Sequence, residues 1–277
     1  MQLKFTLVLL VVSTLFTSTA FAEGASSSAD ISKELSNPNT PLATLNFRTT
    51  HTSFDGSLPT ASDQSSTLTL FQPVFPFPLS KEDKTNFFVR PALPIVWNTP
   101  TTTANGTFKD DGGIADIGFD VAVGKTYNNG IVAVTGLQGL IPTKTDISTE
   151  QWRLGPELLV AYLTKDYYVA VFPAHQWNLS GPGGYSTTQL EIFAGVYLDN
   201  AWTIFTNPKN FYDWKNDQAT IPLNLSVRKV TQIKKVPVKF ELGVDHFIEK
   251  NDRFGQEWAV TLNIVPVVDN FIYSMFK

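Results

Sequence analysis

Hydrophobic and polar residues alternate with a period of two along most of the chain. In residues 239–250, KFELGVDHFIEK, the charged residues Lys239, Glu241 and Asp245 alternate with apolar ones. This period is that of a β-strand with one apolar face and one polar face. Similar stretches bounded by turn-forming residues predict about twelve strands. They lie at residues 45–52, 66–77, 86–97, 114–125, 131–141, 152–164, 167–179, 187–198, 201–207, 220–230, 236–248 and 257–267.

The length of the predicted strands indicates whether their apolar face packs into a protein core or contacts membrane lipid. The alternation alone fits both a soluble β-sandwich, whose apolar face is its core, and a membrane barrel, whose apolar face contacts lipid. Most predicted strands have about ten residues or more, enough to cross a bilayer at a tilt, whereas strands in soluble proteins usually have about five or six. The prediction is an all-β fold, a transmembrane antiparallel up-and-down β-barrel of about 12 strands. A soluble periplasmic β-sandwich that binds a ligand is the alternative.

The segments between the predicted strands alternate between long and short. Outer-membrane barrels show this alternation because their external loops are long and their periplasmic turns are tight. With the long segments outside, the expected external loops include residues 53–65, 98–113, 142–151 and 208–219, of which 98–113 is the longest. The alternation therefore supports the barrel and fixes its expected orientation.

Aromatic residues gather near both ends of the predicted strands. Trp and Tyr rings concentrate at the two membrane interfaces, where they form aromatic girdles. The four expected at the outer interface are Trp97, Trp152, Trp177 and Trp258. The four expected near the inner interface are Tyr162, Tyr167, Tyr197 and Trp202.

The first residues have the features of an export signal. Lys4 precedes an apolar run at residues 5–16, and Ala20, Phe21 and Ala22 form a small-x-small cleavage site. Residues 1–22 are therefore predicted to be a cleaved signal peptide. The chain has no Cys, so it has neither a disulfide framework nor a lipid-anchoring cysteine.

The rest of the chain divides into three predicted parts. Residues 23–44 form a periplasmic segment with a short helix at 28–35 capped by Ser28, and residues 45–267 form the barrel. Residues 268–277 are either a tail or the end of the last strand, and Phe276 is the candidate near-terminal assembly signal. Whether residues 23–44 close the lumen stays open at this point.

The polar face of the strands supplies the candidate lumen. Strand parity points eleven charged residues inward, four of them basic and seven acidic. They are Arg90, Asp116, Asp120, Arg153, Glu157, Glu191, Arg228, Lys239, Glu241, Asp245 and Glu257. One interpretation is a water-filled path whose acidic excess mildly favours cations. The other is a network of salt bridges that braces a narrow barrel, and the two are compatible.

Composition and spacing argue against several kinds of chemistry. The formal net charge of −4 gives no reason to expect nucleic-acid binding. The three His residues do not have metal-ligand spacing, and without Cys we expect no metal and no cofactor. His51 and Ser53 offer the pair of a barrel lipid hydrolase, but no Asn partner is evident, so this is the least favoured alternative. We expect a protein that is not an enzyme.

Seven short motifs, taken together, resemble one bacterial family. They are LFQPVFPFPL at 70–79, VRPALPIV at 89–96, GIADIGF at 113–119, GLIPTKTD at 139–146, LGPELL at 154–159, HQWNLSG at 175–181 and GQEWAVTL at 255–262. In order and spacing the set resembles the outer-membrane family named for the meta-pathway of phenol degradation, over about residues 28–266.

The resemblance implies a Gram-negative outer-membrane barrel that passes small, hydrophobic or aromatic solutes. It carries no catalytic constellation to transfer onto this chain. The predicted function is passive transport by a porin-like channel, with outer-membrane lipid and a small-molecule solute as partners. A non-conducting structural or adhesin-like barrel, with the external loops as its contact surface, is the alternative.

Overall fold

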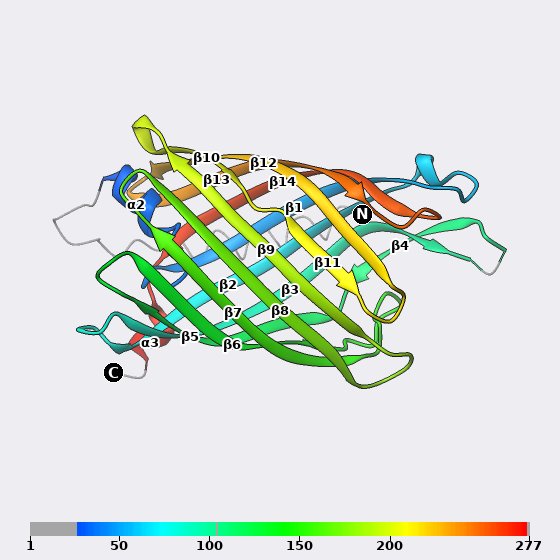
Figure 1. Cartoon of the computed structure of the whole chain (residues 1–277), viewed down its shortest axis with the longest axis horizontal. Coiled ribbons are helices and arrows are strands. Elements are labelled where there is room, and N and C mark those ends of the chain that lie inside the picture. Colours follow the sequence, from blue (N-terminus) through cyan, green and yellow to red (C-terminus); the bar gives the residue numbers. More distant parts are fainter. Residues whose placement is uncertain (1–26, 104, 276–277) are drawn as a thin grey trace.

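The computed structural model describes residues 27–103 and 105–275, and most of them belong to antiparallel β-strands (Figure 1). The strands are β1 (Ala43–Asp55), β2 (Ser65–Ser80), β3 (Thr85–Thr102), β4 (Phe108–Ile114), β5 (Ile117–Thr126), β6 (Ile131–Ile141), β7 (Trp152–Leu163), β8 (Tyr167–Ser180), β9 (Ser186–Tyr197), β10 (Trp202–Thr206), β11 (Lys209–Asp213), β12 (Gln218–Ile233), β13 (Val236–Glu249) and β14 (Gly255–Val268).

The sheet closes on itself. β1 pairs with β14 in a register that places Phe47 opposite Ile264 and Arg48 opposite Asn263. β4 and β5 both pair with β3 and form one wall strand with a break at residues 115–116. β10 and β11 likewise both pair with β9 and β12. With each of these pairs counted once, the described part of the chain forms a closed barrel of twelve wall strands. The predicted fold is confirmed, and the β-sandwich alternative is wrong because the strands form one closed ring.

The outer face of the barrel is apolar. Alternate residues on each strand point outward, and they include exposed large side chains such as Leu242 and Leu262, which are 49% and 46% exposed and adjacent in register. Their inward neighbours are polar or small. An exposed apolar surface that surrounds the whole barrel is the lipid-facing band of a transmembrane barrel.

The two ends of the barrel differ (Figure 1). The end that carries α2 (Ser28–Glu34) and α3 (Phe271–Ser274), termed the helix end, has short turns such as residues 127–130. At the opposite end, termed the loop end, neighbouring strands extend as long hairpins. The alternation of long and short connections predicted this difference.

Two segments expected to be loops are in fact strands. Residues 98–113 continue as β3 and β4 around a short turn, because their run of Thr residues favours extended backbone. Within residues 208–219, β11 forms and pairs with both β9 and β12. The barrel wall at the loop end is therefore taller than the sequence pattern indicated.

The segments next to the barrel have defined positions. α2 begins after Ser27, not Ser28 as expected, because Ser27 and Asp30 form a reciprocal capping box. β1 starts at Ala43, two residues before the expected boundary, and β14 ends at Val268. Residues 1–22 of the predicted signal peptide, and Phe276, lie outside the described residues. Neither α2 nor α3 is long and apolar enough to cross a membrane.

Candidate functional site

The barrel lumen contains two cavities that share part of their lining. Each has a volume of about 310 Å³. The helix-end cavity is bounded by residues 35–38, and the loop-end cavity is bounded by inward residues of β1, β12, β13 and β14. Both cavities are lined by Arg48, Glu191, Phe205, Asn207, Lys209 and Glu241. The shared lining makes the two cavities successive parts of one lumen.

The N-terminal segment packs into the lumen at the helix end. Ile31 of α2 is buried against Ala201, Val230 and Val267, and the hydroxyls of Ser32 and Thr203 lie 3.4 Å apart. These contacts bury the apolar face of α2 against the inward side chains of β10, β12 and β14. The helix therefore lies inside the barrel mouth and not beside it.

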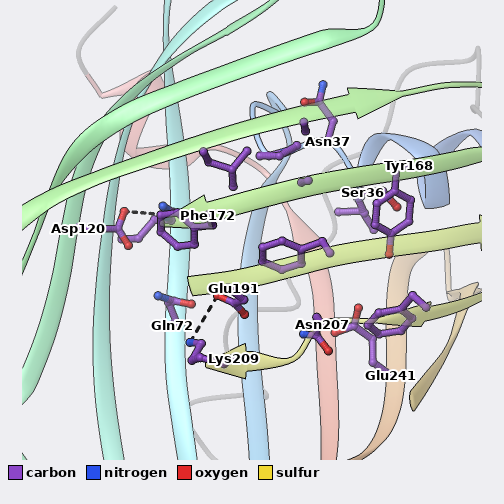
Figure 2. A pocket seen from close by; sticks show the side chains of 18 of the residues that line it. Ser36, Asn37, Gln72, Asp120, Tyr168, Phe172, Glu191, Asn207, Lys209 and Glu241 are labelled. Atoms are coloured by element: carbon purple, nitrogen blue, oxygen red, sulfur yellow. Dashed lines mark hydrogen bonds and ion pairs between the residues drawn. The ribbon is translucent and has the colours of Figure 1, made fainter. Parts of the chain in front are cut away.

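The chain then crosses the lumen to the opposite wall. Arg228 Nη1 of β12 donates a hydrogen bond to Ser36 Oγ at 2.6 Å. On the other side, Asn39 Nδ2 donates to Lys84 O at 2.8 Å and to Thr126 Oγ1 at 2.9 Å, and Asn86 Nδ2 donates to Asn39 O at 2.9 Å. Residues 27–42 thus span the helix end from β12 to β3 and β5, and Figure 2 shows Ser36 and Asn37 at the cavity.

A glycine lets one large ring lie flat at the helix end of the lumen. Tyr168 on β8 is 4% exposed and packs against Tyr197 with ring centroids 5.6 Å apart. A Cβ on Gly195 would lie 2.5 Å from the Tyr168 ring, so any larger residue would displace it. The ring lies against the wall and lines the helix-end cavity.

One charged group of the lumen lies on the wall made by β12, β13, β14 and β1, termed the β12–β1 wall. Glu241 accepts from Arg228 Nε at 2.7 Å and from Lys239 Nζ at 3.1 Å. Asn263 Nδ2 donates to the same carboxylate at 2.6 Å. Arg48 occupies the next strand in register with Asn263. These side chains form a row across four neighbouring strands.

A second charged group lies across the lumen, on the wall made by β3, β5, β6 and β7, termed the β3–β7 wall. Arg90 Nε contacts Asp120 Oδ1 at 2.5 Å, and Arg90 Nη2 lies 3.6 Å from Glu157 Oε1. Glu157 is 3% exposed. Between the two walls, Lys209 Nζ lies 3.7 Å from a Glu191 carboxylate oxygen, as Figure 2 shows. Most lumen charges are therefore held in ion pairs.

Strand parity predicted an excess of acidic residues in the lumen, and the two cavities do not show it. Their charged lining consists of five basic and five acidic residues. The basic ones are Arg48, Arg90, Lys209, Arg228 and Lys239, and the acidic ones are Asp120, Glu157, Glu191, Glu241 and Asp245.

Sequence reasoning missed two of the five basic residues. Arg48 has the inward parity of its predicted strand, so the pattern held the signal to find it. Lys209 was hidden because β11 was expected to be part of a loop.

Three expected lumen residues lie outside the two cavities, at the loop end. Arg153 stacks over the Tyr185 ring at 3.7 Å, and its Nε donates to Gln151 Oε1 at 2.9 Å. Glu257 lies near the loop end of β14. Asp116 occupies the break between β4 and β5 and binds the neighbouring segment at residues 143–149.

Asp116 anchors residues 143–149. Its carboxylate accepts from Ser148 Oγ at 2.5 Å, from Thr149 Oγ1 at 2.6 Å and from the backbone N–H groups of Thr149 and Thr143 at 2.8 and 3.1 Å. Burial opposes ionisation of this carboxyl, but the four hydrogen bonds outweigh it and lower the pKa of Asp116 below its ordinary value. Asp116 is therefore a negative group that fixes a loop at the rim.

The eight aromatic residues predicted to form the girdles lie near the two ends, and seven of them are exposed. Trp97, Trp152, Trp177 and Trp258 are exposed near the loop end, and Tyr162, Tyr167 and Trp202 near the helix end. Trp214 was missed; it is exposed near the loop end, and its Nε1 donates to Thr188 Oγ1 at 2.8 Å. Tyr197 also lies near the helix end, at the last residue of β9, but its ring faces the lumen, because it shares the inward parity of Glu191 and packs on Tyr168.

The His51 and Ser53 side chains do not form a pair. His51 Nδ1 lies 3.0 Å from Thr67 Oγ1, and Ser53 Oγ donates to Trp258 O at 3.5 Å. The hydrogen-bond partners needed for a hydrolytic pair are therefore engaged elsewhere. Within the described residues, no group of three or more His, Asp or Glu side chains has the arrangement of a metal site.

Solved structures share the architecture. An outer membrane channel from Pseudomonas putida F1 superposes with a TM-score of 0.64 at 12% sequence identity, over 82% of this chain and 95% of that one. The chain has the fold of an outer-membrane β-barrel. The NanC porin superposes with a TM-score of 0.52 at 10% identity, over 81% of this chain and 99% of that one.

A barrel enzyme is a more distant structural match. The outer membrane phospholipase A from Escherichia coli gives a TM-score of 0.44 at 13% identity, over 89% of this chain and 100% of that one. A similarity of this size does not bear on activity. No family model matches the sequence, and no curated protein matches it.

Proposed function

We propose that the chain is an outer-membrane channel for passive diffusion of small solutes. In this proposal the loop end faces the outside and the helix end faces the periplasm, after export through the signal peptide at residues 1–22. The observation that carries it is the pair of cavities that follow one another inside a closed barrel and share part of their lining. A barrel braced throughout by side chains would have no such volume.

The lining favours solutes that combine an apolar body with a polar group. Aromatic side chains face both cavities beside the ion pairs, among them Phe172, Phe205 and Phe211. A small aromatic molecule would contact these rings and still find hydrogen-bond partners. This solute class agrees with the resemblance to the family named for the meta-pathway of phenol degradation, and membership of that family is part of the proposal.

A non-conducting structural barrel is the second candidate. It is favoured by the hydrogen bonds that tie residues 27–42 to both sides of the helix end. A solute leaving the helix-end cavity must pass residues 35–38, which line it. The two candidates therefore differ in whether this segment lets solutes through.

Because the chain has no Cys, a designed disulfide can test the proposal. Ser32→Cys with Thr203→Cys would lock α2 to β10, since the two hydroxyls lie 3.4 Å apart. In proteoliposomes we expect the unmodified protein and the reduced variant to pass small aromatic alcohols, and the oxidised variant to pass them more slowly. The single variant Ser32→Cys, oxidised in the same way, is the control. An unmodified protein that folds yet passes no solute would support the non-conducting barrel.

A further inference from the structure

Arg48 differs from the other cations of the lumen. Four basic residues lining the cavities lie within ion-pair distance of a carboxylate, and these are Arg90, Lys209, Arg228 and Lys239. Among the described residues, Arg48 has no hydrogen-bond or ion-pair partner, although it lines both cavities. Its half-buried side chain therefore lines the boundary between the two cavities without a carboxylate of the described residues within ion-pair distance.

The wall around Arg48 has one carboxylate too few. Arg228, Glu241, Asn263 and Arg48 follow one another in register across β12, β13, β14 and β1. Glu241 is already bound by Arg228, Lys239 and Asn263. Three cations thus gather around one carboxylate, and the local charge is positive.

The other carboxylate of this wall is engaged elsewhere. Asp245 lies two inward positions farther along β13, toward the loop end, and accepts from Asn224 Nδ2 at 2.8 Å. It makes no ion pair within the described residues. Among the described residues, the carboxylates nearest to Arg48 along this wall, Glu241 and Asp245, therefore form no ion pair with it, and part of the positive charge at Arg48 stays unbalanced.

An unused acceptor lies next to Arg48. Asn263 is 2% exposed, and its Oδ1 is buried without a hydrogen-bond partner in the described chain. A buried acceptor without a donor costs free energy. Asn263 Oδ1 accepts no hydrogen bond from Arg48 in the described chain, so the Arg48 donors stay available to an acceptor oxygen of a bound molecule.

Apolar rings lie on either side of the junction. Phe205 lines both cavities, Phe211 and Phe247 line the loop-end cavity, and Phe172 and Phe193 line the helix-end cavity. A ligand whose charged group binds Arg48 can therefore place an apolar body in either cavity. The site combines an unpaired guanidinium with aromatic walls.

We propose that Arg48 binds the carboxylate of a small organic anion with an aromatic or aliphatic body. The guanidinium matches a carboxylate in two parallel hydrogen bonds, which favours Arg over a point charge at this position. The inference rests on the proposed function, since it names the solute class that the lumen selects. Neutral aromatic molecules would enter the same lumen with weaker binding.

Equilibrium binding tests the proposal without relying on transport. Benzoate and its cationic counterpart benzylamine are titrated into the full-length protein in detergent micelles, with binding followed by ligand-observed NMR. We expect benzoate to bind more tightly than benzylamine. We expect Arg48→Gln to weaken benzoate binding by about tenfold or more, which corresponds to about 1.4 kcal/mol, and Arg48→Lys to weaken it less.

Lys215→Gln is the matched control, because it removes the same charge from an exposed turn at the loop end. It should leave benzoate binding unchanged. Equal binding of benzoate and benzylamine to the unmodified protein, or unchanged benzoate binding in Arg48→Gln, would overturn the inference. The comparison of the two probes needs no variant and stays informative if a variant fails to fold.

Transport measurements separate this inference from the proposed function. Benzoate binding that depends on Arg48, with no solute passing through proteoliposomes, would remove the channel function and keep the site. Solute passage that Arg48→Gln leaves unchanged in rate and in preference for benzoate would keep the channel and remove the site.

Discussion

The two charged walls of the lumen hold opposite excess charge. The β12–β1 wall carries three cations and two carboxylates that line the cavities, namely Arg48, Arg228, Lys239, Glu241 and Asp245. The β3–β7 wall carries one cation and two carboxylates, namely Arg90, Asp120 and Glu157. With the Glu191–Lys209 pair between them, the lumen is balanced in total but polarised from one wall to the other.

This comparison shows why a total charge says little about a channel. An acidic excess would attract cations along the whole path, whereas opposed walls give a solute two different surfaces. A molecule with one charged group and an apolar body would then prefer one wall. Changes that remove the charge of one wall alone are the way to test the difference.

The largest expected effect follows loss of the single cation on the β3–β7 wall. Arg90→Gln leaves Asp120 and Glu157 facing each other without a counter-ion. We expect a loss of about 3 kcal/mol in the free energy of unfolding, at the low end for a broken buried pair because the Arg90 side chain is 25% exposed. Urea unfolding in lipid vesicles, followed by Trp fluorescence, measures it. Stability equal to that of the unmodified protein would show that the wall is hydrated and needs no pairing.

A smaller effect is expected from the opposite change on the β12–β1 wall. Glu241→Gln leaves Arg228 and Lys239 without a carboxylate, but the side-chain oxygen of the Gln can still accept a hydrogen bond from Arg228. We expect a loss of about 2 kcal/mol in the free energy of unfolding, together with a shift of the reversal potential that reports higher selectivity for anions. Glu249→Gln, on an exposed end of the same strand, should change neither quantity. A shift of the reversal potential that reports higher selectivity for cations would contradict the positive net charge assigned to the β12–β1 wall.

Asp116 lies outside both walls and serves as a reference for them. Asp116→Asn should lower the free energy needed to detach residues 143–149 from the rim by about 1–2 kcal/mol. It should leave ion selectivity unchanged. Trypsin cleavage after Lys144, in intact proteoliposomes, measures the loosening.

The pH dependence of the same loop has a definite sign. Because the folded-state pKa of Asp116 is lowered, its contribution is complete above the ordinary Asp pKa of about 3.9 and is lost as the pH falls through the lowered pKa. The loop should therefore stay protected at neutral pH. It should open to an acid-active protease only at pH values below about 3.9. Opening near neutral pH would mean that another group holds the loop.

The smallest expected effect concerns the hydrogen bond between the N-terminal segment and the β12–β1 wall. Ser36→Ala removes the acceptor of the 2.6 Å bond from Arg228 and should weaken docking of the segment by about 1 kcal/mol. Hydrogen exchange of the backbone amides in residues 31–39 should rise, while exchange in β5 stays the same. Equal protection in both proteins would show that the packing of α2 and the hydrogen bonds of Asn39 hold the segment without Ser36.

Much of the fold could be predicted from the sequence, because a closed barrel is built from a local period of two. The alternation around Lys239 and Glu241, and the length of these strands, indicate both the inward side chains and the lipid-facing ones. Strand extensions were missed where β3 and β4 continue beyond the expected loop, since Thr and Asp residues occur in both strands and turns.

The arrangement of the side chains in the lumen was harder to predict from the sequence. Parity placed Glu157 and Asp120 inward, but nothing local shows that Arg90 lies between them or that Arg48 lacks a partner. Those facts depend on register between neighbouring strands. The position of Ser36 beneath Arg228 depends on a chain crossing, because the two residues are separated by 192 positions.

Chemical labelling of single cysteines tests the polarised lumen most directly, because the natural chain has no Cys. Thr50 lies two positions from Arg48 on β1, and Gln138 is opposite Asp120 in register. We predict that Thr50→Cys reacts faster with a negatively charged methanethiosulfonate than with a positively charged one, and that Gln138→Cys shows the reverse preference. The same preference at both positions, or no reaction at either, would contradict the account.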